Sequence, residues 1–219
     1  MITGIYLFLE TILYAIIITQ RGELQVAASY ISILCCFAYL LINIRQCDGF
    51  ILGASACTVM ADYFLVVHSP IQRLWGMVFF LGAQTLYALR LHFWQRNKLL
   101  LILGFVLIGA ALGITVVILR EKTDALALIS LCYYANLAMN IVVAFTKWKS
   151  CKLLCIGFVL FLLCDTVIGL QVASGAYLPI AEGSWLHNVL FMNFPLAWFF
   201  YLPSQVLLAL SGVKNSART

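Results

Sequence analysis

Residues 152–173 read KLLCIGFVLFLLCDTVIGLQVA, an apolar run that contains a single acidic residue, Asp165. A helix needs about 20 mostly apolar residues to cross the hydrocarbon core of a membrane. The whole chain shares this character, since 64% of its 219 residues are hydrophobic and only 10% are charged. A soluble domain is about 45–50% apolar and about 25% charged. The composition therefore predicts an integral membrane protein and excludes a soluble enzyme or a nucleic-acid-binding module.

Eight segments are long and apolar enough to cross a membrane, and short polar stretches separate them. The predicted spanning helices are Ile2–Thr19, Leu24–Ile44, Gly49–Val67, Leu74–Leu91, Leu99–Leu119, Ala125–Phe145, Lys152–Ala173 and Trp185–Ser211. Gaps this short favour sequential antiparallel neighbours in a bundle. The predicted fold class is all-α, a polytopic integral membrane bundle of eight transmembrane helices that forms one domain over residues 1–219. The first apolar run lacks the features of a cleaved secretory signal, so we expect it to be the first span.

The lysine and arginine residues in the gaps predict the orientation of the bundle, because cytoplasmic loops are enriched in them. Nine basic residues fall on the side of the two termini and four on the opposite side. We therefore expect both termini to be cytoplasmic, in the plasma membrane or, in a bacterium, in the inner membrane. The eight cysteines lie inside apolar helices or on the cytoplasmic side, where disulfides are rare, so we expect free thiols.

Three acidic residues fall within the predicted helices: Glu10, Asp62 and Asp165. Ionisable side chains inside a membrane are costly and are usually functional. Asp62 lies 13 residues after Gly49, and Asp165 lies 13 residues after Lys152. Both helices run outwards from the cytoplasm, so both carboxyl groups are expected at one level, about 20 Å from the cytoplasmic end. Two carboxyl groups in one cavity cannot easily both ionise, which favours an acid and a base near neutral pH. The alternative is that each one caps or hydrogen-bonds a neighbouring helix.

Other polar side chains follow single faces of the predicted helices, where their commonest role is to join helices by hydrogen bonds. Glu10 has Tyr6 and Tyr14 four residues to either side on the same face, so these hydroxyls can bond its carboxyl group, and a structural and a functional role are equally open. The residues expected to border a polar cavity and to orient water or substrate there are Gln84, Tyr87, Tyr134, Asn140, Tyr201, Gln205 and Glu10. Helices 74–91 and 185–211 also share Phe-Phe, Gln and Ala-Leu at similar spacing, which suggests a weak 4+4 parallel repeat.

The sequence predicts neither a metal nor a cofactor. The three histidines, His68, His92 and His187, lie at helix ends, and no spacing typical of a zinc site is present. All six lysines lie in gaps, at helix ends or in the tail, so no buried amine is available for a Schiff base. Neither a nucleophile elbow nor a phosphate-binding glycine loop is found. The carboxyl groups are therefore the candidates for chemistry.

Three groups of residues resemble the signature of the YhhN family of eight-helix membrane proteins, which includes lysoplasmalogenases. The first group comprises Asp62, Gly76, Phe80, Gln84 and Tyr87. The second comprises Gly157, Phe161, Cys164, Asp165 and Thr166. The third comprises Tyr201, Gln205, Ala209, Leu210 and Ser211. The chain departs from the family pattern at Ala61, where the family has Gly, and at Gln84, where it has His. A glutamine can hydrogen-bond but cannot transfer a proton.

The resemblance implies hydrolysis of the vinyl ether bond of a lysoplasmalogen, giving a fatty aldehyde and a glycerophospho-base. Protonation of the β-carbon gives an oxocarbenium ion, water adds, and the hemiacetal collapses. One neutral carboxylic acid and one carboxylate suffice for such a reaction, as in glycoside hydrolysis, without a metal or cofactor. On this hypothesis Asp62 and Asp165 are catalytic, and the partners are a lysophospholipid substrate and membrane lipids. Two alternatives remain open: a proton-coupled or small-molecule transporter that uses the same carboxylates, and a non-catalytic lipid-binding member of the family.

Overall fold

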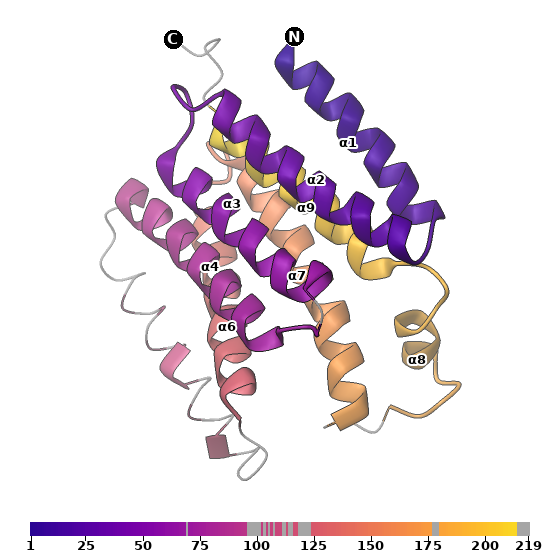
Figure 1. Ribbon diagram of the computed structural model, residues 1–219. Coiled ribbons are helices and arrows are strands. Elements are labelled where there is room, and N and C mark those ends of the chain that lie inside the picture. The colour runs from indigo at the N-terminus through magenta and orange to yellow at the C-terminus, as the bar shows by residue number, and fades with distance from the viewer. Residues whose placement is uncertain are drawn as a thin grey trace.

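The structure is a computed structural model, and in the part that it describes the chain is all-helical (Figure 1). The described residues are 1–68, 70–95, 102, 104, 106, 108–110, 113, 116–117, 124–176 and 180–213. The elements are α1 (Ile2–Thr19), α2 (Glu23–Ile42), α3 (Gly49–Asp62), the π-helical turn η1 (Tyr63–Val67), α4 (Arg73–Gln95), α6 (Ala125–Phe145), α7 (Lys152–Ala176), α8 (Trp185–Leu190) and α9 (Leu196–Gly212). The predicted span Leu99–Leu119 lies largely outside the described residues.

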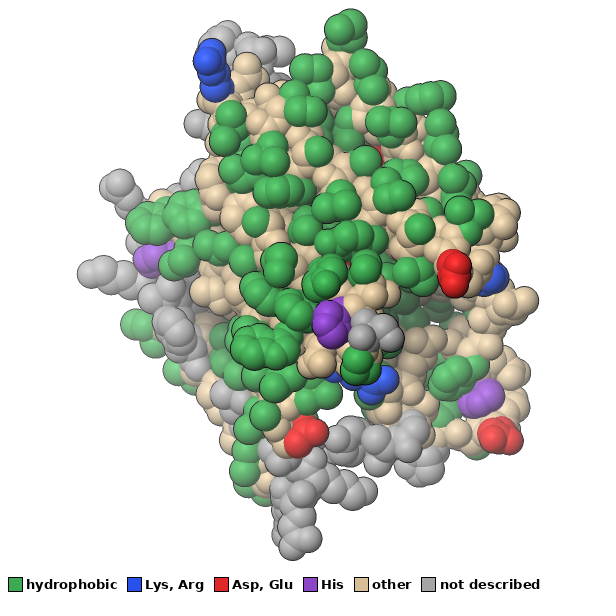
Figure 2. Space-filling view, viewed as in Figure 1, with side chains coloured by type: hydrophobic (Ala, Val, Ile, Leu, Met, Phe, Trp, Pro, Cys, Tyr) green, Lys and Arg blue, Asp and Glu red, His purple; other side chains and the backbone are tan. Residues whose placement is uncertain are grey.

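Among the described helices, six are long and apolar enough to cross a membrane, when α3 and η1 are taken together as one. A shorter apolar helix, α9, packs among them. The outer surface suits lipid, since α1 alone exposes Ile5, Phe8 and Ile12 by 43–66%. Figure 2 shows one face covered largely by hydrophobic side chains, with the few charged ones gathered near its margins. A multi-pass membrane protein is the class that this fold fits.

The two ends of the described chain lie at the same end of the bundle, which we call the terminal end (Figure 1). Near the start of α1, the Thr3 hydroxyl hydrogen-bonds the Tyr39 hydroxyl of α2 at 3.3 Å. The end of α9 meets the α2–α3 turn, where the Asp48 N–H donates to the Gly212 carbonyl at 2.8 Å. The opposite or distal end holds the η1–α4 turn and the starts of α6 and α9. Helices α3 and α7 both begin at the terminal end, so Asp62 and Asp165 both lie towards the distal end.

An ion pair fixes three helices together at the terminal end. Arg90 of α4 is 5% exposed, and its Nε donates to Asp48 Oδ2 at 2.8 Å. The other carboxylate oxygen of Asp48 accepts from the Phe50 N–H at 3.0 Å and so caps α3. Arg90 Nη2 reaches the Ser211 carbonyl of α9 at 3.4 Å. Arg90 is one of the nine basic residues counted on the side of the termini, but it acts in packing and is not a loop charge.

The predicted continuous helix Trp185–Ser211 is wrong, because the chain forms α8 and α9 with residues 191–195 between them. The break has a local cause in Pro195, which caps the start of α9. A proline lacks an N–H donor, and it disfavours the helical conformation in the residue before it, Phe194. The break lets α9 begin at Leu196, so that its next turns face the interior of the bundle.

A second proline lies inside α9 and makes a link to α1. Pro203 has no N–H to give to the carbonyl of Phe199, four residues earlier. That carbonyl instead accepts the Tyr14 hydroxyl of α1 at 3.3 Å. The proline is therefore tolerated because a neighbouring helix satisfies the freed acceptor.

Two glycines of the family signature stand where other side chains come close. A Cβ on Gly157 of α7 would come within 2.9 Å of the Leu208 side chain and 3.3 Å of the Ser204 carbonyl, both on α9. A Cβ on Gly76 of α4 would clash with the side chain of Leu65 in η1. Small residues allow such close approach of helices in membranes. These contacts fix α7 against α9 and α4 against η1, the elements that carry the site.

Candidate active site

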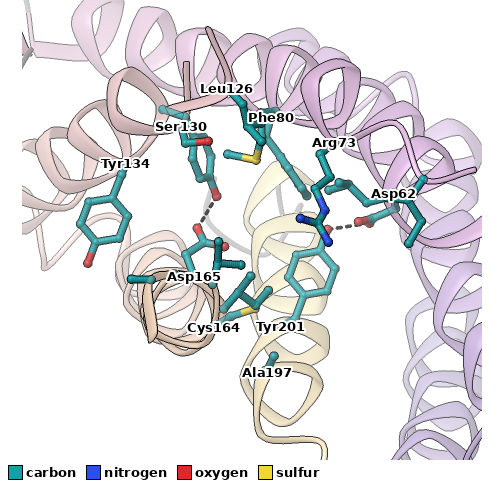
Figure 3. Close-up of a pocket in the computed structure, with 18 of the residues that line it drawn as sticks. Asp62, Arg73, Phe80, Leu126, Ser130, Tyr134, Cys164, Asp165, Ala197 and Tyr201 are labelled. Atoms are coloured by element: carbon teal, nitrogen blue, oxygen red, sulfur yellow. Dashed lines mark hydrogen bonds between the residues drawn. The ribbon is translucent and has the colours of Figure 1, made fainter. Parts of the chain in front are cut away.

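A cavity of about 590 Å³ lies towards the distal end, between η1, α4, α6, α7 and α9 (Figure 3). Pockets that bind small molecules commonly measure about 300–1,000 Å³. Its walls are mostly apolar, with Leu65, Val66, Ile71, Met77, Phe80, Leu126, Ile168 and Val172 among the lining residues. Its polar lining is small and includes both aspartates of the family signature, Asp62 and Asp165.

Asp62 is the last residue of α3 and is only 3% exposed. One of its oxygens, Oδ2, accepts the hydroxyl of Tyr201 from α9 at 2.6 Å. The π-helical turn η1 follows directly, closed by a hydrogen bond of 2.8 Å from the His68 N–H to the Tyr63 carbonyl. π-Helical turns are rare in proteins, but those that occur are often found at functional sites. Here the turn changes the helical repeat immediately after the carboxyl group.

Asp165 lies in the middle of α7 and has a similar partner from a different helix. Its Oδ2 accepts the hydroxyl of Tyr133, which belongs to α6. Asp165 is half-buried, whereas Tyr133 is buried. Each aspartate of the cavity therefore receives one tyrosine hydroxyl from a neighbouring helix, and Figure 3 shows the two carboxyl groups on different walls of the opening.

Two signature phenylalanines hold the tyrosines in place. The Phe161 ring lies between them, with its centroid 5.4 Å from that of Tyr201 and 6.3 Å from that of Tyr133. The Phe80 ring meets Tyr133 at 5.7 Å and Tyr201 at 6.3 Å. Tilted and edge-on aromatic contacts of this kind add to the free energy of burial and fix ring orientation. The four rings form one aromatic cluster, and three of them, those of Phe80, Tyr133 and Tyr201, line the cavity. Both tyrosine hydroxyls are directed from this cluster at the carboxyl groups.

Three residues expected at the cavity lie elsewhere in the core. The Asn140 amide donates to the backbone carbonyl of Gln84 at 2.9 Å and to its Oε1 at 3.0 Å, which joins α6 to α4. Tyr87 is 2% exposed, and its ring packs edge-on against Phe158 at 5.1 Å. None of these lines the cavity. The glutamine that replaces the family histidine is therefore outside the cavity wall, in a helix-joining position.

The other expected residues divide in the same way. Tyr201 and Tyr134 line the cavity, and the Tyr134 hydroxyl bonds the Thr166 hydroxyl of α7 at 2.9 Å. Gln205 lies one turn beyond Tyr201 and is 5% exposed, but it is not among the lining residues. It is thus a neighbour of the site through α9 and does not border the open space.

Glu10 belongs to a separate region, and the expected role of Tyr6 and Tyr14 at its carboxyl group is wrong. The carboxyl oxygens of Glu10 accept from the Ser32 hydroxyl at 2.5 Å and from the Cys36 thiol at 3.7 Å, both on α2. The Tyr6 hydroxyl instead meets Cys36 Sγ at 3.2 Å. A tyrosine four residues away along one helix is less well placed than the small polar residues of the helix packed against it.

The cavity lining also includes charged, polar and aromatic residues that were not expected at the site from the sequence, among them Arg73, Asp124, Ser130 and Trp198. Arg73 begins α4 and Asp124 immediately precedes α6, whereas Ser130 lies in the second turn of α6 and Trp198 in the first turn of α9. The available signal was the position of Arg73 at the outer end of a helix that follows an aspartate-bearing one. Charged residues between helices are usually solvated, so the sequence position of Arg73 alone does not indicate that it lines a cavity. The packing of the helices is needed to show that.

The cavity has the parts needed for proton transfer but no evident metal site. Within the described residues, no group of three or more His, Cys, Asp or Glu side chains could hold a metal ion. All eight cysteines are free. The paired carboxyl groups can donate and accept protons, and the apolar walls can receive a hydrocarbon chain and exclude bulk water.

The fold and this cavity define a class, a multi-pass helical membrane protein with two tyrosine-bound aspartates facing one apolar cavity. The sequence pattern of the YhhN family matches residues 4–212, essentially the whole chain. The protein belongs to the YhhN family. No curated protein and no solved structure matches the chain significantly.

Proposed function

We propose that this protein is a membrane hydrolase that cleaves the vinyl ether bond of lysoplasmalogens, releasing a fatty aldehyde and a glycerophospho-base. The observation that carries the proposal is the shared cavity of Asp62 and Asp165, each bound to a tyrosine hydroxyl. Membership of a family that includes lysoplasmalogenases supports the same reaction.

The proposed reaction uses the two carboxyl groups in turn. One, in its neutral form, transfers a proton to the β-carbon of the vinyl ether, which leaves an oxocarbenium ion. The other, as a carboxylate, stabilises that cation and then takes a proton from the water that attacks it. The resulting hemiacetal loses the glycerol oxygen as an alcohol, so that one water is consumed for each aldehyde released. The assignment of acid and base between Asp62 and Asp165 stays open.

The surroundings of the carboxyl groups support this chemistry. Apolar walls concentrate a lipid chain, and they strengthen the interaction of a carboxylate with a developing cation by excluding water. Tyr201 and Tyr133 donate hydrogen bonds to the carboxyl groups, which fixes the oxygens in position. Preorganised groups of this kind contribute much of the rate enhancement in enzymes.

We also propose that the terminal end is cytoplasmic and that the cavity opens towards the opposite leaflet. The support is the excess of basic residues on the side of the termini, eight against four when the buried Arg90 is left out. Exposed cavity residues such as Ile71, at 57%, lie at the distal end. The substrate would then enter from the outer leaflet.

The test is incubation of the purified protein with matched lysolipids in the same detergent. The substrates are a 1-alkenyl, a 1-alkyl and a 1-acyl lysophospholipid, and the product is free aldehyde, trapped as a hydrazone. Aldehyde from the alkenyl lipid alone supports the proposal. Release of fatty acid from the acyl lipid would contradict the proposal and indicate an esterase. Lipid uptake into proteoliposomes without aldehyde would contradict it and indicate a transporter.

A further inference from the structure

Two side chains of opposite charge, Arg73 and Asp124, line the cavity at its distal end. Both are exposed, and they come from different elements, the first turn of α4 and the residue before α6. Figure 3 shows Arg73 extending from α4 into the opening that Asp62 and Tyr201 border. The proposed reaction gives neither of them a part in proton transfer, so their role at the cavity is still to be assigned.

The charges of both residues are available to a ligand. In the described part of the chain Arg73 makes no ion pair, whereas the other described arginine near this end, Arg21, donates to the backbone carbonyls of Ile18, Gln20 and Asn193. Asp124 Oδ1 accepts the Ala127 N–H at 2.7 Å, which caps α6. A carboxylate has about four acceptor positions, so this cap orients Asp124 and leaves its second oxygen able to bind.

We propose that Arg73 and Asp124 form a subsite for a zwitterionic headgroup, in which Arg73 binds the phosphate and Asp124 binds the ammonium group. The inference rests on the proposed function and extends it to the part of the substrate that is recognised. Arginine matches phosphate oxygens with paired N–H donors, and a carboxylate matches an ammonium ion. At the opening, each charge of a phosphoethanolamine or phosphocholine group then meets a side chain of the opposite charge.

The placement of Arg73 also offsets the repulsion between an anionic substrate and the carboxyl groups of the cavity. An anionic phosphate is repelled by any ionised carboxyl group in the cavity, here Asp62 or Asp165. A guanidinium group at the opening offsets that repulsion and holds the phosphate at the mouth, so that the apolar chain and the ether bond enter the cavity. A bound headgroup therefore also sets the position of the ether bond relative to the carboxyl groups.

Three 1-alkenyl substrates with the same chain separate the two contacts. One is the alkenylglycerol, the second carries phosphate alone, and the third carries phosphoethanolamine. In the unchanged protein we expect kcat/KM to rise from the alkenylglycerol to the phosphate-bearing lipid and again to the phosphoethanolamine lipid. Arg73→Gln should remove the gain due to phosphate, about 10- to 100-fold, and leave the alkenylglycerol nearly unchanged. Asp124→Asn keeps an N-cap and should remove only the gain due to ethanolamine.

Arg21→Gln is the matched control, because it removes a positive charge near the same end but outside the cavity. It should leave the ranking of the three substrates intact, and Arg73→Lys should restore part of the phosphate gain. Equal loss with all three substrates in Arg73→Gln, or the same change in Arg21→Gln, would overturn the subsite.

A binding measurement separates this inference from the proposed reaction. The saturated 1-alkyl counterparts of the three lipids cannot be cleaved in this way, and their Kd values are measured by quenching of tryptophan fluorescence. If the subsite exists, Arg73→Gln weakens only the phosphate-bearing ligands, whether or not aldehyde is formed. Absence of aldehyde with intact headgroup selectivity would defeat the hydrolase proposal alone. Unchanged Kd values in Arg73→Gln would defeat the subsite alone.

Discussion

Two regions of the molecule bury carboxyl groups in the apolar interior, and they differ in what lies beside those groups. Glu10 is 3% exposed between α1 and α2, where the Ser32 hydroxyl and the Cys36 thiol donate to it. Asp62 is equally buried but borders a cavity of about 590 Å³, together with Asp165. Glu10 is not among the residues that line this cavity.

Burial of an acid in the membrane therefore does not by itself indicate catalysis. Both regions satisfy their carboxyl groups by hydrogen bonds, as burial requires. At Glu10 the donors come from one adjacent helix, and the result is a contact between two helices. At the cavity the donors come from α6 and α9, and the carboxyl groups border an open, largely apolar space. Matched changes in the two regions should therefore have different effects.

The largest effect is expected from replacing either cavity aspartate by asparagine. Asparagine has nearly the same shape and can still accept the tyrosine hydroxyl, but it cannot act as an acid or base. We expect Asp62→Asn and Asp165→Asn each to lower kcat for aldehyde release by about 10²- to 10⁴-fold. The melting temperature in detergent should stay close to that of the unchanged protein. Near-normal turnover in either variant would remove that aspartate from the mechanism.

The next effect concerns the tyrosines that orient the carboxyl groups. Tyr201→Phe and Tyr133→Phe each remove one hydroxyl donor and leave the aromatic cluster in place. We expect kcat to fall by about 10-fold or more, since a hydrogen bond to a charged group is worth about 1.5–3 kcal/mol. Tyr6→Phe is the control, because its hydroxyl meets Cys36 beside Glu10. A loss of the same size in Tyr6→Phe would mean that the tyrosines act through stability of the bundle.

A smaller effect should follow from filling the cavity. Gly169 of α7 lines it, and a Cβ built there meets nothing within 4 Å. The backbone there accepts a Cβ, so Gly169→Phe should place its ring in space that the lipid chain needs and raise KM several-fold with little change in kcat. Gly4→Phe is the matched control on α1, where a Cβ also meets nothing within 4 Å. Equal KM values in the two variants would show that the lipid does not use this cavity.

The smallest effect is expected at the other carboxyl group. Glu10→Gln keeps an oxygen that can accept from Ser32, so the contact between α1 and α2 is largely preserved. Aldehyde release should change by less than about 2-fold, and the free energy of unfolding should change by about 1 kcal/mol or less. The measurements are initial rates and thermal unfolding in one detergent. A loss of activity like that of Asp62→Asn would erase the distinction between the two regions.

Much of the helical pattern could be predicted because apolar runs and their polar ends are local properties of the sequence. The helix Ala125–Phe145 has the predicted bounds, and α7 begins at the predicted Lys152. Pro195 is a local signal for a helix break, but the apolar residues on both sides of it favoured the prediction of one continuous span. The π-helical turn after Asp62 has no comparable local signal, since it depends on how η1 packs against α4.

The pairing of side chains across helices was harder to predict than the positions of the carboxyl groups. Asp62 and Asp165 share a position relative to their helix starts, which simple counting reveals. Which tyrosine meets which aspartate depends on the rotation of α6 and α9 about their axes. For that reason Tyr134 was expected at the site, whereas the adjacent Tyr133 is the residue that meets Asp165. The partners of Glu10 on α2 were missed for the same reason.

The proposed reaction requires that Asp62 and Asp165 act as one acid–base pair. The double variant Asp62→Asn/Asp165→Asn tests this requirement. Residues that act as a unit show strongly non-additive effects, because the first loss already removes the shared function. The measurement is single-turnover aldehyde release from an alkenyl lysolipid by the two single variants and the double variant, at equal folded protein. If the two aspartates act as a pair, the rate of the double variant should lie within a few-fold of that of the slower single variant. A rate reduced by the product of the two single losses would contradict it and make the aspartates independent contributors.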